Sequence, residues 1–194
     1  MLFRSLHAAL GLSPIAHGRV RDVDLASVLA SPGVIDAITA ADLPGDNQCG
    51  PIAADDPILA DGSVVYAGQP IFAVLARSHD QARRAARRAR LDIEALPAIL
   101  DIRSAIEQSS FVLPTQRLVR GEPESTLARA PFRLKGSLAI GGQDHFYLEG
   151  QIAAALPQDD GSMLILSSTQ HPSEIQHLVA HALGKSAHEV TVQS

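Results

Sequence analysis

Cysteine, tryptophan and aromatic residues in general are scarce or missing in this chain. Of its 194 residues, one is cysteine, none is tryptophan and only 4% are aromatic. The single cysteine, Cys49, excludes a disulfide framework within the chain and any metal or cluster site built only from its own thiolates. One cysteine also agrees with a reducing compartment, so we expect a cytoplasmic protein. The core is expected to consist mainly of Ala, Val, Leu and Ile.

The charge and hydropathy of the chain argue against nucleic-acid-binding and membrane proteins. The formal net charge is −5, whereas contacts to phosphates need a basic face, so no nucleic acid is expected as a partner. No apolar run reaches eighteen residues, so no membrane-spanning helix is expected. Residues 1–16 loosely imitate a secretory signal, but His7 interrupts the apolar stretch and Ser13-Pro14 breaks it early. The composition, 46% hydrophobic and 19% charged, is typical of a globular protein.

The first half of the sequence alternates short strands with helices. Residues 17–23 are predicted as an edge strand, and residues 24–29 as a helical turn with Asp24 at its N-cap. The segment 71–75 is almost wholly apolar, so it is expected at the centre of a sheet. Further strands are predicted at residues 34–39, 64–66 and 91–94, with a loop rich in Gly, Asn, Asp and Pro over residues 44–57.

The clearest helix is predicted to begin at Ser78. Gln81 follows three residues later, which is the spacing of a capping box. Alanines then recur at helical spacing and predict a narrow buried stripe, whereas arginines fill the rest of the circumference and indicate a solvated face. The alanines are Ala82, Ala85, Ala86 and Ala89, and the arginines are Arg83, Arg84, Arg87, Arg88 and Arg90.

The second half begins with a segment that resembles a linker and then returns to strands. Residues 111–129 are polar and contain prolines, and residues 131–140 are predicted as a strand. Two strands joined as a hairpin are predicted at residues 151–156 and 163–168, and a last strand begins at residue 190. Between them a helix is predicted to begin at Pro172 and end at Gly184, with Ile175, Leu178, Val179 and Ala182 as its buried stripe.

The sequence argues against several common catalytic and nucleotide-binding sites, because each lacks a residue that such a site requires. His177 and His181 have the spacing of two metal ligands on one helix face, but Leu178 stands where a zinc protease would carry its glutamate. A surface or core-edge histidine pair is the preferred interpretation. Asp144, His145 and Glu149 suggest acid–base chemistry, but no nucleophile elbow accompanies them. Neither a P-loop nor a dinucleotide fingerprint is present.

Residues 141–149 carry the most specific motif, Gly-Gly-Gln-Asp-His-Phe-Tyr-Leu-Glu. This motif resembles the signature of the molybdenum-binding subunit of xanthine dehydrogenases and related molybdenum hydroxylases. The similarity runs from residues 6–13 to residues 190–193, and residues 65–98 resemble the α/β hammerhead domain of that family. The resemblance implies an α/β (α+β) fold. We expect an a/b hammerhead domain over residues 1–114, a linker over residues 115–130 and the incomplete start of the molybdopterin-binding domain over residues 131–194.

The resemblance also implies a cofactor-binding role for Gln143 and Gly142. In the family, the glutamine of this motif approaches the molybdenum and hydrogen-bonds to one of its oxo ligands. A carboxamide suits that task, because it donates an N–H without adding charge to an anionic centre. Gly142 would let the backbone pass beside the cofactor. The residues alone leave an alternative, in which Gln143 satisfies backbone groups at a strand end. No catalytic residue is assigned, because the family's catalytic glutamate lies in a motif beyond Ser194.

The function implied is that of an oxidoreductase of purine catabolism. The family enzyme hydroxylates hypoxanthine and xanthine, and electrons pass through iron–sulfur centres and FAD on partner chains to NAD. By this comparison the chain is an N-terminal fragment, inactive alone, whose partner is the iron–sulfur and FAD subunit. One alternative is a fragment of a sibling aldehyde oxidase or carbon monoxide dehydrogenase large subunit. Another is a non-enzymatic assembly module built from the hammerhead half.

Overall fold

The computed structural model describes residues 5–148 and 150–194 and divides them into two units. Unit 1 contains the described residues up to Ala98 together with residues 150–194, and unit 2 contains residues 99–148. Unit 1 is therefore built from two stretches of chain that are distant in sequence. None of the described helices is long and apolar enough to cross a bilayer.

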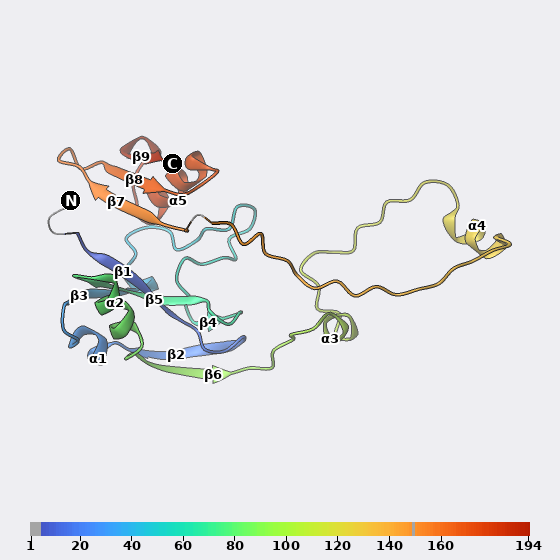
Figure 1. Cartoon of the computed structure of the whole chain (residues 1–194), viewed down its shortest axis with the longest axis horizontal. Helices are drawn as coiled ribbons and strands as arrows, with labels where there is room; N and C mark the ends of the chain where they lie inside the picture. The colour runs from blue at the N-terminus through green and yellow to red at the C-terminus, as the bar shows by residue number, and fades with distance from the viewer. Residues whose placement is uncertain (1–4, 149) are drawn as a thin grey trace. The chain divides into compact units, whose positions relative to one another are not determined.

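The first sheet of unit 1 is centred on the apolar strand β5, Pro70–Ala76 (Figure 1). Strands β1, His7–Leu12, and β3, Val34–Thr39, flank β5 and are both antiparallel to it. The side chains of β5 are almost all buried, because the strand has neighbours on both edges and packing on its faces. The prediction of a central strand here is confirmed, and the predicted bounds of β3 are those observed.

The second sheet has the order β4-β2-β6 and corrects two predictions. Strand β2, Gly18–Asp24, lies between β4, Ser63–Val64, and β6, Arg90–Ala95, so it is central and not an edge strand. Its alternation of polar and apolar residues arose from one solvated face, which central antiparallel strands also have. Strand β4 is two residues long, shorter than predicted.

Two helices connect the strands of the first half. Helix α1, Ala26–Leu29, has Leu25 at its N-cap, one residue later than predicted; Asp24 ends β2, and its Oδ1 accepts a hydrogen bond from Ala26 N at 2.9 Å. Helix α2, His79–Ala86, begins as predicted, because Ser78 Oγ accepts from Gln81 N at 3.3 Å. Ala82 and Ala85 are fully buried against β1 and β5, whereas the five arginines are exposed. A short 3-10 turn, η1, spans Ala40–Asp42.

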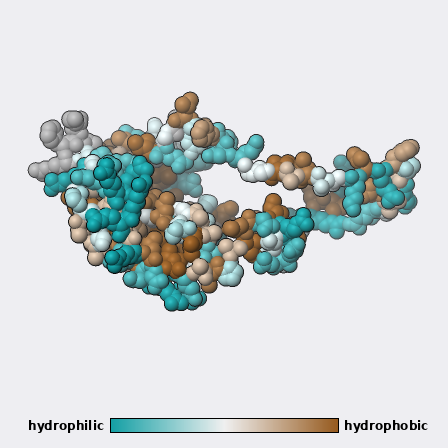
Figure 2. Space-filling model, turned by 60° about the horizontal axis from the view of Figure 1, so that its bottom comes forward, coloured by the Kyte–Doolittle hydropathy of each residue, from teal (hydrophilic) through white to brown (hydrophobic). Residues whose placement is uncertain are grey.

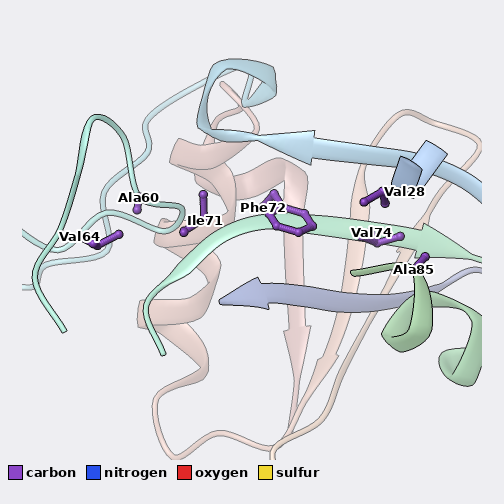
Figure 3. Close-up of a cluster of buried hydrophobic side chains, with 7 residues drawn as sticks. All are labelled: Val28, Ala60, Val64, Ile71, Phe72, Val74 and Ala85. Carbon is purple, nitrogen blue, oxygen red and sulfur yellow. The ribbon is translucent and has the colours of Figure 1, made fainter. Parts of the chain in front are cut away.

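The main core lies around β5 (Figure 3). Phe72 is the largest fully buried side chain, and Gly11 faces it across β1 and β5. A Cβ at Gly11 would lie 2.0 Å from the ring of Phe72, so glycine is required there for the ring to fit. The buried cluster consists of Val28, Ala60, Val64, Ile71, Phe72, Val74 and Ala85.

The second stretch of unit 1 forms a small sheet covered by one helix. Strands β7, Ala153–Pro157, and β8, Met163–Ser167, form the predicted antiparallel hairpin. Strand β9, Val190–Gln193, pairs parallel to β8, and the connection between them contains helix α5, Pro172–Ala182, and the 3-10 turn η2, Ala187–Glu189. Ile165, Ala180 and Val190 form its buried centre. Gly184 adopts a φ of +62°, as expected for a glycine just after a helix end.

A loop in the first stretch of unit 1, which ends at Ala98, caps the C-terminal end of α5 in the second stretch, residues 150–194. Gly45 N donates to Ala182 O at 3.1 Å, and Asp46 N donates to His181 O at 2.8 Å. The carbonyls at a helix C-terminus lack donors within the helix, so the loop supplies one donor to each of these two, and His181 O also accepts from Gly184 N at 3.1 Å. The predicted loop character of residues 44–57 is observed, apart from an isolated bridge between Gln48 and Pro57.

Unit 2 contains little regular structure. Helix α3, Ile102–Glu107, was not predicted, and helix α4, Pro123–Arg129, lies in the segment that was expected to be a linker. The strand predicted over residues 131–140 is wrong for this structure, because those residues form neither a helix nor a strand. A strand needs a hydrogen-bonded neighbour, and this segment has none among the described residues.

Candidate functional site

The predicted cofactor motif lies at the C-terminal end of unit 2. Residues 141–147 form no helix, strand or turn, and every residue from Gly141 to Leu148 is exposed. Nothing lies within 4 Å of the Cβ position of Gly141 or Gly142. The backbone before Gln143 is therefore open on the side where a side chain would project, which leaves room for a large group to approach it.

Three consecutive polar residues line a hollow immediately after the glycines. Gln143, Asp144 and His145 line an open space of about 350 Å³. Phe146 follows with a φ of +49°, a left-handed conformation that non-glycine residues seldom adopt. The structure thus brings Gln143 together with two residues that sequence reasoning treated as a separate acid–base set.

Of the residues that line this space, the carboxamide of Gln143 fits an oxo-bearing group, whereas the carboxylate of Asp144 does not favour an anion. The carboxamide of Gln143 makes no hydrogen bond to any described residue, so its N–H donors and its carbonyl are free for a ligand. No enclosing wall comes from elsewhere in unit 2, where no described residue is buried. Within the described ranges, no group of three His, Cys, Asp or Glu side chains is arranged to hold a metal ion. Glu149, the last residue of the motif, lies outside the described residues.

The histidine pair of α5 lies on the surface, as preferred from the sequence. His177 and His181 are both exposed, and their ring centroids are 6.4 Å apart. His181 also accepts, through its backbone carbonyl, the hydrogen bond from Asp46 N. The pair therefore belongs to the capped end of the helix, and it lies in a different unit from Gln143.

A pocket in unit 1 was not anticipated from the sequence. It has a volume of about 440 Å³ and is lined mainly by apolar side chains, including Tyr66, Leu178 and Val179. Cys49 lies at its wall, where burial, followed by the negative charge of Asp56, raises the pKa of the thiol above its ordinary value. A thiol held protonated is a poor nucleophile and a poor metal ligand. No sequence signal marks the pocket, because its walls come from two loops and a helix that are distant in the chain.

Two family models match nearly the whole chain. The model of the aldehyde oxidase and xanthine dehydrogenase a/b hammerhead domain matches residues 2–97. The model of the molybdopterin cofactor-binding domain matches residues 107–194, which include the motif around Gln143. The chain belongs to the aldehyde oxidase and xanthine dehydrogenase family. The expected fold class, a hammerhead domain followed by part of a molybdopterin-binding domain, is confirmed by these matches.

Relatives within the family carry more than one enzyme name. A xanthine dehydrogenase of Emericella nidulans is 39% identical over 95% of this chain and 14% of its own length. Aldehyde oxidase 2 of Rattus norvegicus is 36% identical over 93% of this chain and 13% of its own length. Among solved structures, the aldehyde oxidoreductase of Desulfovibrio gigas superposes with a TM-score of 0.83 at 27% identity, over 97% of this chain and 23% of that chain. The chain thus spans about 14% of the length of the curated relatives it matches first.

Proposed function

We propose that this chain supplies Gln143 to the molybdenum cofactor site of a xanthine dehydrogenase. The observation that carries the proposal is the free carboxamide of Gln143, directly after two glycines whose open side admits a large group. Its position inside the segment matched by the molybdopterin-binding model supports the same role. The domain bounds of the family comparison, with the hammerhead ending near residue 114 and the cofactor domain starting near residue 131, belong to this proposal.

The role of Gln143 follows from the chemistry of its side chain. The molybdenum cofactor, when bound, supplies the redox chemistry of the hydroxylation. The Nε2 amide of Gln143 would donate a hydrogen bond to the bound cofactor and would thereby help to orient it. Since the amide is neutral, it adds no negative charge beside an anionic group. Gly142 allows the backbone to lie against the cofactor, because it has no Cβ to keep the two apart.

The substrate and the path of electrons depend on parts of the enzyme outside this chain. We infer that the assembled enzyme oxidises hypoxanthine and xanthine in the cytoplasm, as part of purine catabolism. Iron–sulfur centres and FAD on a partner subunit would carry the electrons to NAD. Cys49, the only cysteine, cannot ligate such a cluster by itself, so the clusters need ligands from elsewhere. This chain alone contributes only Gln143 and Gly142 to the proposed site, so it is expected to show no turnover.

An aldehyde-oxidising enzyme is the second candidate. The chain is 36% identical to a rat aldehyde oxidase and 39% identical to a xanthine dehydrogenase. These two identities are too close to decide between the two enzymes. The motif in residues 143–147 and the sequence Thr169-Gln170-His171-Pro172 favour the purine enzyme on resemblance. Among residues 5–148 and 150–194, no contact or side chain favours a carbon monoxide dehydrogenase or a non-enzymatic assembly module.

The proposal is tested in a chimera. This chain replaces the matching part of the Emericella nidulans relative, and xanthine turnover and molybdenum content are measured. Gln143→Ala is expected to lower turnover roughly 10- to 100-fold, the usual effect of losing a residue that orients a metal's ligands, while molybdenum stays bound. Gln116→Ala, an exposed glutamine in the same unit, serves as the matched control and should leave turnover unchanged. Unaltered turnover in Gln143→Ala would overturn the assigned role.

A further inference from the structure

Positive charge is concentrated on α2 and on the turns beside it, although the chain as a whole is acidic. Residues 77–90 contain six arginines and one acidic residue, Asp80, so their formal net charge is +5. The other 180 residues contain ten basic and twenty acidic residues, a net charge of −10. All six arginines are exposed. A surface on which one sign of charge is gathered attracts ligands of the opposite sign.

We use the name arginine face for the exposed arginines of α2 and the turn that follows it. Its members are Arg83, Arg84, Arg87, Arg88 and Arg90. Two of the five have partners, because Arg84 pairs with Asp80 at 3.0 Å and Arg88 Nη1 donates to Ser31 Oγ at 3.2 Å. The other three form neither an ion pair nor a side-chain hydrogen bond with any described residue.

The arginines of the helix repel one another. Arg87 follows Arg83 by four residues and Arg84 by three, and like charges at these spacings destabilise a helix. Cations in the last turn stabilise a helix through its terminal carbonyls, but Arg83 and Arg84 already occupy that turn of α2. The arginines that follow therefore add repulsion, which a bound anion would relieve.

The packing of α2 holds the arginine face toward solvent. Ala82 and Ala85 are buried on the opposite side of the helix, against β1 and β5. In Figure 2, hydrophilic residues gather at the left of the view, which is also where α2 lies in Figure 1. Residues 77–90 contain no aromatic residue and no apolar residue larger than alanine. A partner of this surface is therefore recognised by charge.

We propose that the arginine face binds a short, extended, acidic segment of a partner polypeptide. Arginine binds a carboxylate through two parallel hydrogen bonds. Alternate residues of an extended segment are about 7 Å apart. Four residues rise about 6 Å along a helix, so carboxylates at alternate positions can reach Arg83 and Arg87 together. This inference does not depend on the cofactor role of Gln143.

A short acidic segment fits the charge distribution better than a nucleic acid or a membrane does. Nucleic acids are charged along their whole length and anionic membranes over a wide plane, so either would also meet the remainder of the chain, whose net charge is −10. Single-stranded nucleic acids are held by stacking on aromatic side chains, and membrane-surface helices insert large apolar ones. Residues 77–90 have neither. Charges more than about 10 Å from a bound segment are largely screened at 0.1 M salt, so a segment confined to the arginine face avoids the repulsion.

An NMR titration of the full chain with the peptide Glu-Ser-Glu-Ser-Glu-Ser-Glu-Ser tests the proposal. The backbone amide signals of residues 79–90 are expected to shift at low salt. Arg83→Gln with Arg87→Gln should weaken binding about 5- to 10-fold, because each exposed ion pair contributes modestly. Arg120→Gln with Arg129→Gln makes the same change of charge in unit 2 and should leave the affinity unchanged. Equal weakening in the two variants, or no binding to the unmodified chain, overturns the proposal.

Urea unfolding separates a binding role from a structural one. Because repulsion is relieved, Arg83→Gln with Arg87→Gln should keep the urea midpoint of the unmodified chain or raise it. A lower midpoint would show that these arginines stabilise the end of the helix, and the reason for inferring a partner would be lost.

Two other outcomes would assign the arginine face to a different partner. A single-stranded DNA dodecamer or phosphatidylserine vesicles could bind more tightly than the peptide, with that binding lost in Arg83→Gln with Arg87→Gln. The full chain could also form a salt-sensitive dimer in size-exclusion chromatography that the same variant loses, which would make the partner a second copy. Either result overturns the proposed acidic segment.

Discussion

Gly45 is the residue on which the link between the two stretches of unit 1 depends most directly. A Cβ at this position would lie 1.9 Å from the carbonyl oxygen of His181 and 2.5 Å from Gly184 N. Both atoms are backbone, so neither yields by changing a rotamer. Gly45→Ala must therefore move the loop and break the hydrogen bonds that Gly45 N and Asp46 N donate to the end of α5.

We expect Gly45→Ala to lower the free energy of unfolding of unit 1 by about 1–3 kcal/mol, as overpacking and lost buried hydrogen bonds do. Urea unfolding followed by circular dichroism measures the change. Gly136→Ala is the matched control, since a Cβ there meets nothing within 4 Å and its φ is not positive. Equal stability of the two variants would show that the loop does not hold α5.

Cys49 provides a second residue-level prediction, through its raised pKa. Burial disfavours the thiolate first, and the negative charge of Asp56 disfavours it further. Because the thiolate is the reactive form, iodoacetamide should modify Cys49 more slowly at pH 8 than it modifies a free thiol. Asp56→Asn removes the charge and should speed the reaction, with Asp55→Asn as the neighbouring control. A reaction profile centred near the free-thiol pKa of about 8.5 would contradict this.

At the scale of elements, β5 carries the stability of the first sheet. Phe72 is fully buried at its centre, whereas Phe132 in unit 2 is 91% exposed. Truncating a buried phenylalanine to alanine costs about 3–5 kcal/mol, because transfer and cavity terms add. Phe72→Ala should therefore unfold unit 1 or shift its urea midpoint strongly. Phe132→Ala in this chain alone should leave the midpoint unchanged, and a comparable shift in the two variants would contradict the assigned core.

The elements that the sequence predicted well are those whose signals are local. The Ser78 cap and the alanine stripe predicted α2, and Pro172 with Gly184 predicted α5, because caps and helical periodicity act within a few residues. The strand β5 was predicted from its apolar run. The position of β2 in its sheet was predicted wrongly, since alternation reports one solvated face but not the number of neighbouring strands.

The candidate site shows a different limit of prediction. The strand predicted over residues 131–140 is wrong for this structure, because pairing depends on a partner that these residues do not find among the described residues. The motif at Gln143 was found from resemblance, and the structure adds its free amide and the hollow that it shares with Asp144 and His145. The unit 1 pocket had no local signal, because tertiary packing alone creates it.

At the scale of the whole molecule, the two units differ in how they are stabilised. Unit 1 has two buried clusters, one in each stretch of its chain, and backbone hydrogen bonds between the stretches. Unit 2 has no buried described residue, and its arginines at positions 117, 120 and 129 are all exposed. Local opening should therefore cost much less in unit 2 than in unit 1, and a protease should distinguish them.

We expect brief trypsin treatment to cut unit 2 first and to leave two fragments that remain associated. The N-terminal fragment keeps the loop at Gly45, and the C-terminal fragment keeps α5, so the hydrogen bonds to His181 and Ala182 still join them. Size-exclusion chromatography with mass spectrometry should find both fragments in one peak. In Gly45→Val the larger side chain meets the same backbone atoms, and the fragments should separate. Separation in the unmodified chain would mean that unit 1 depends on the covalent connection through unit 2, and the contacts at α5 would then be too weak to define a unit.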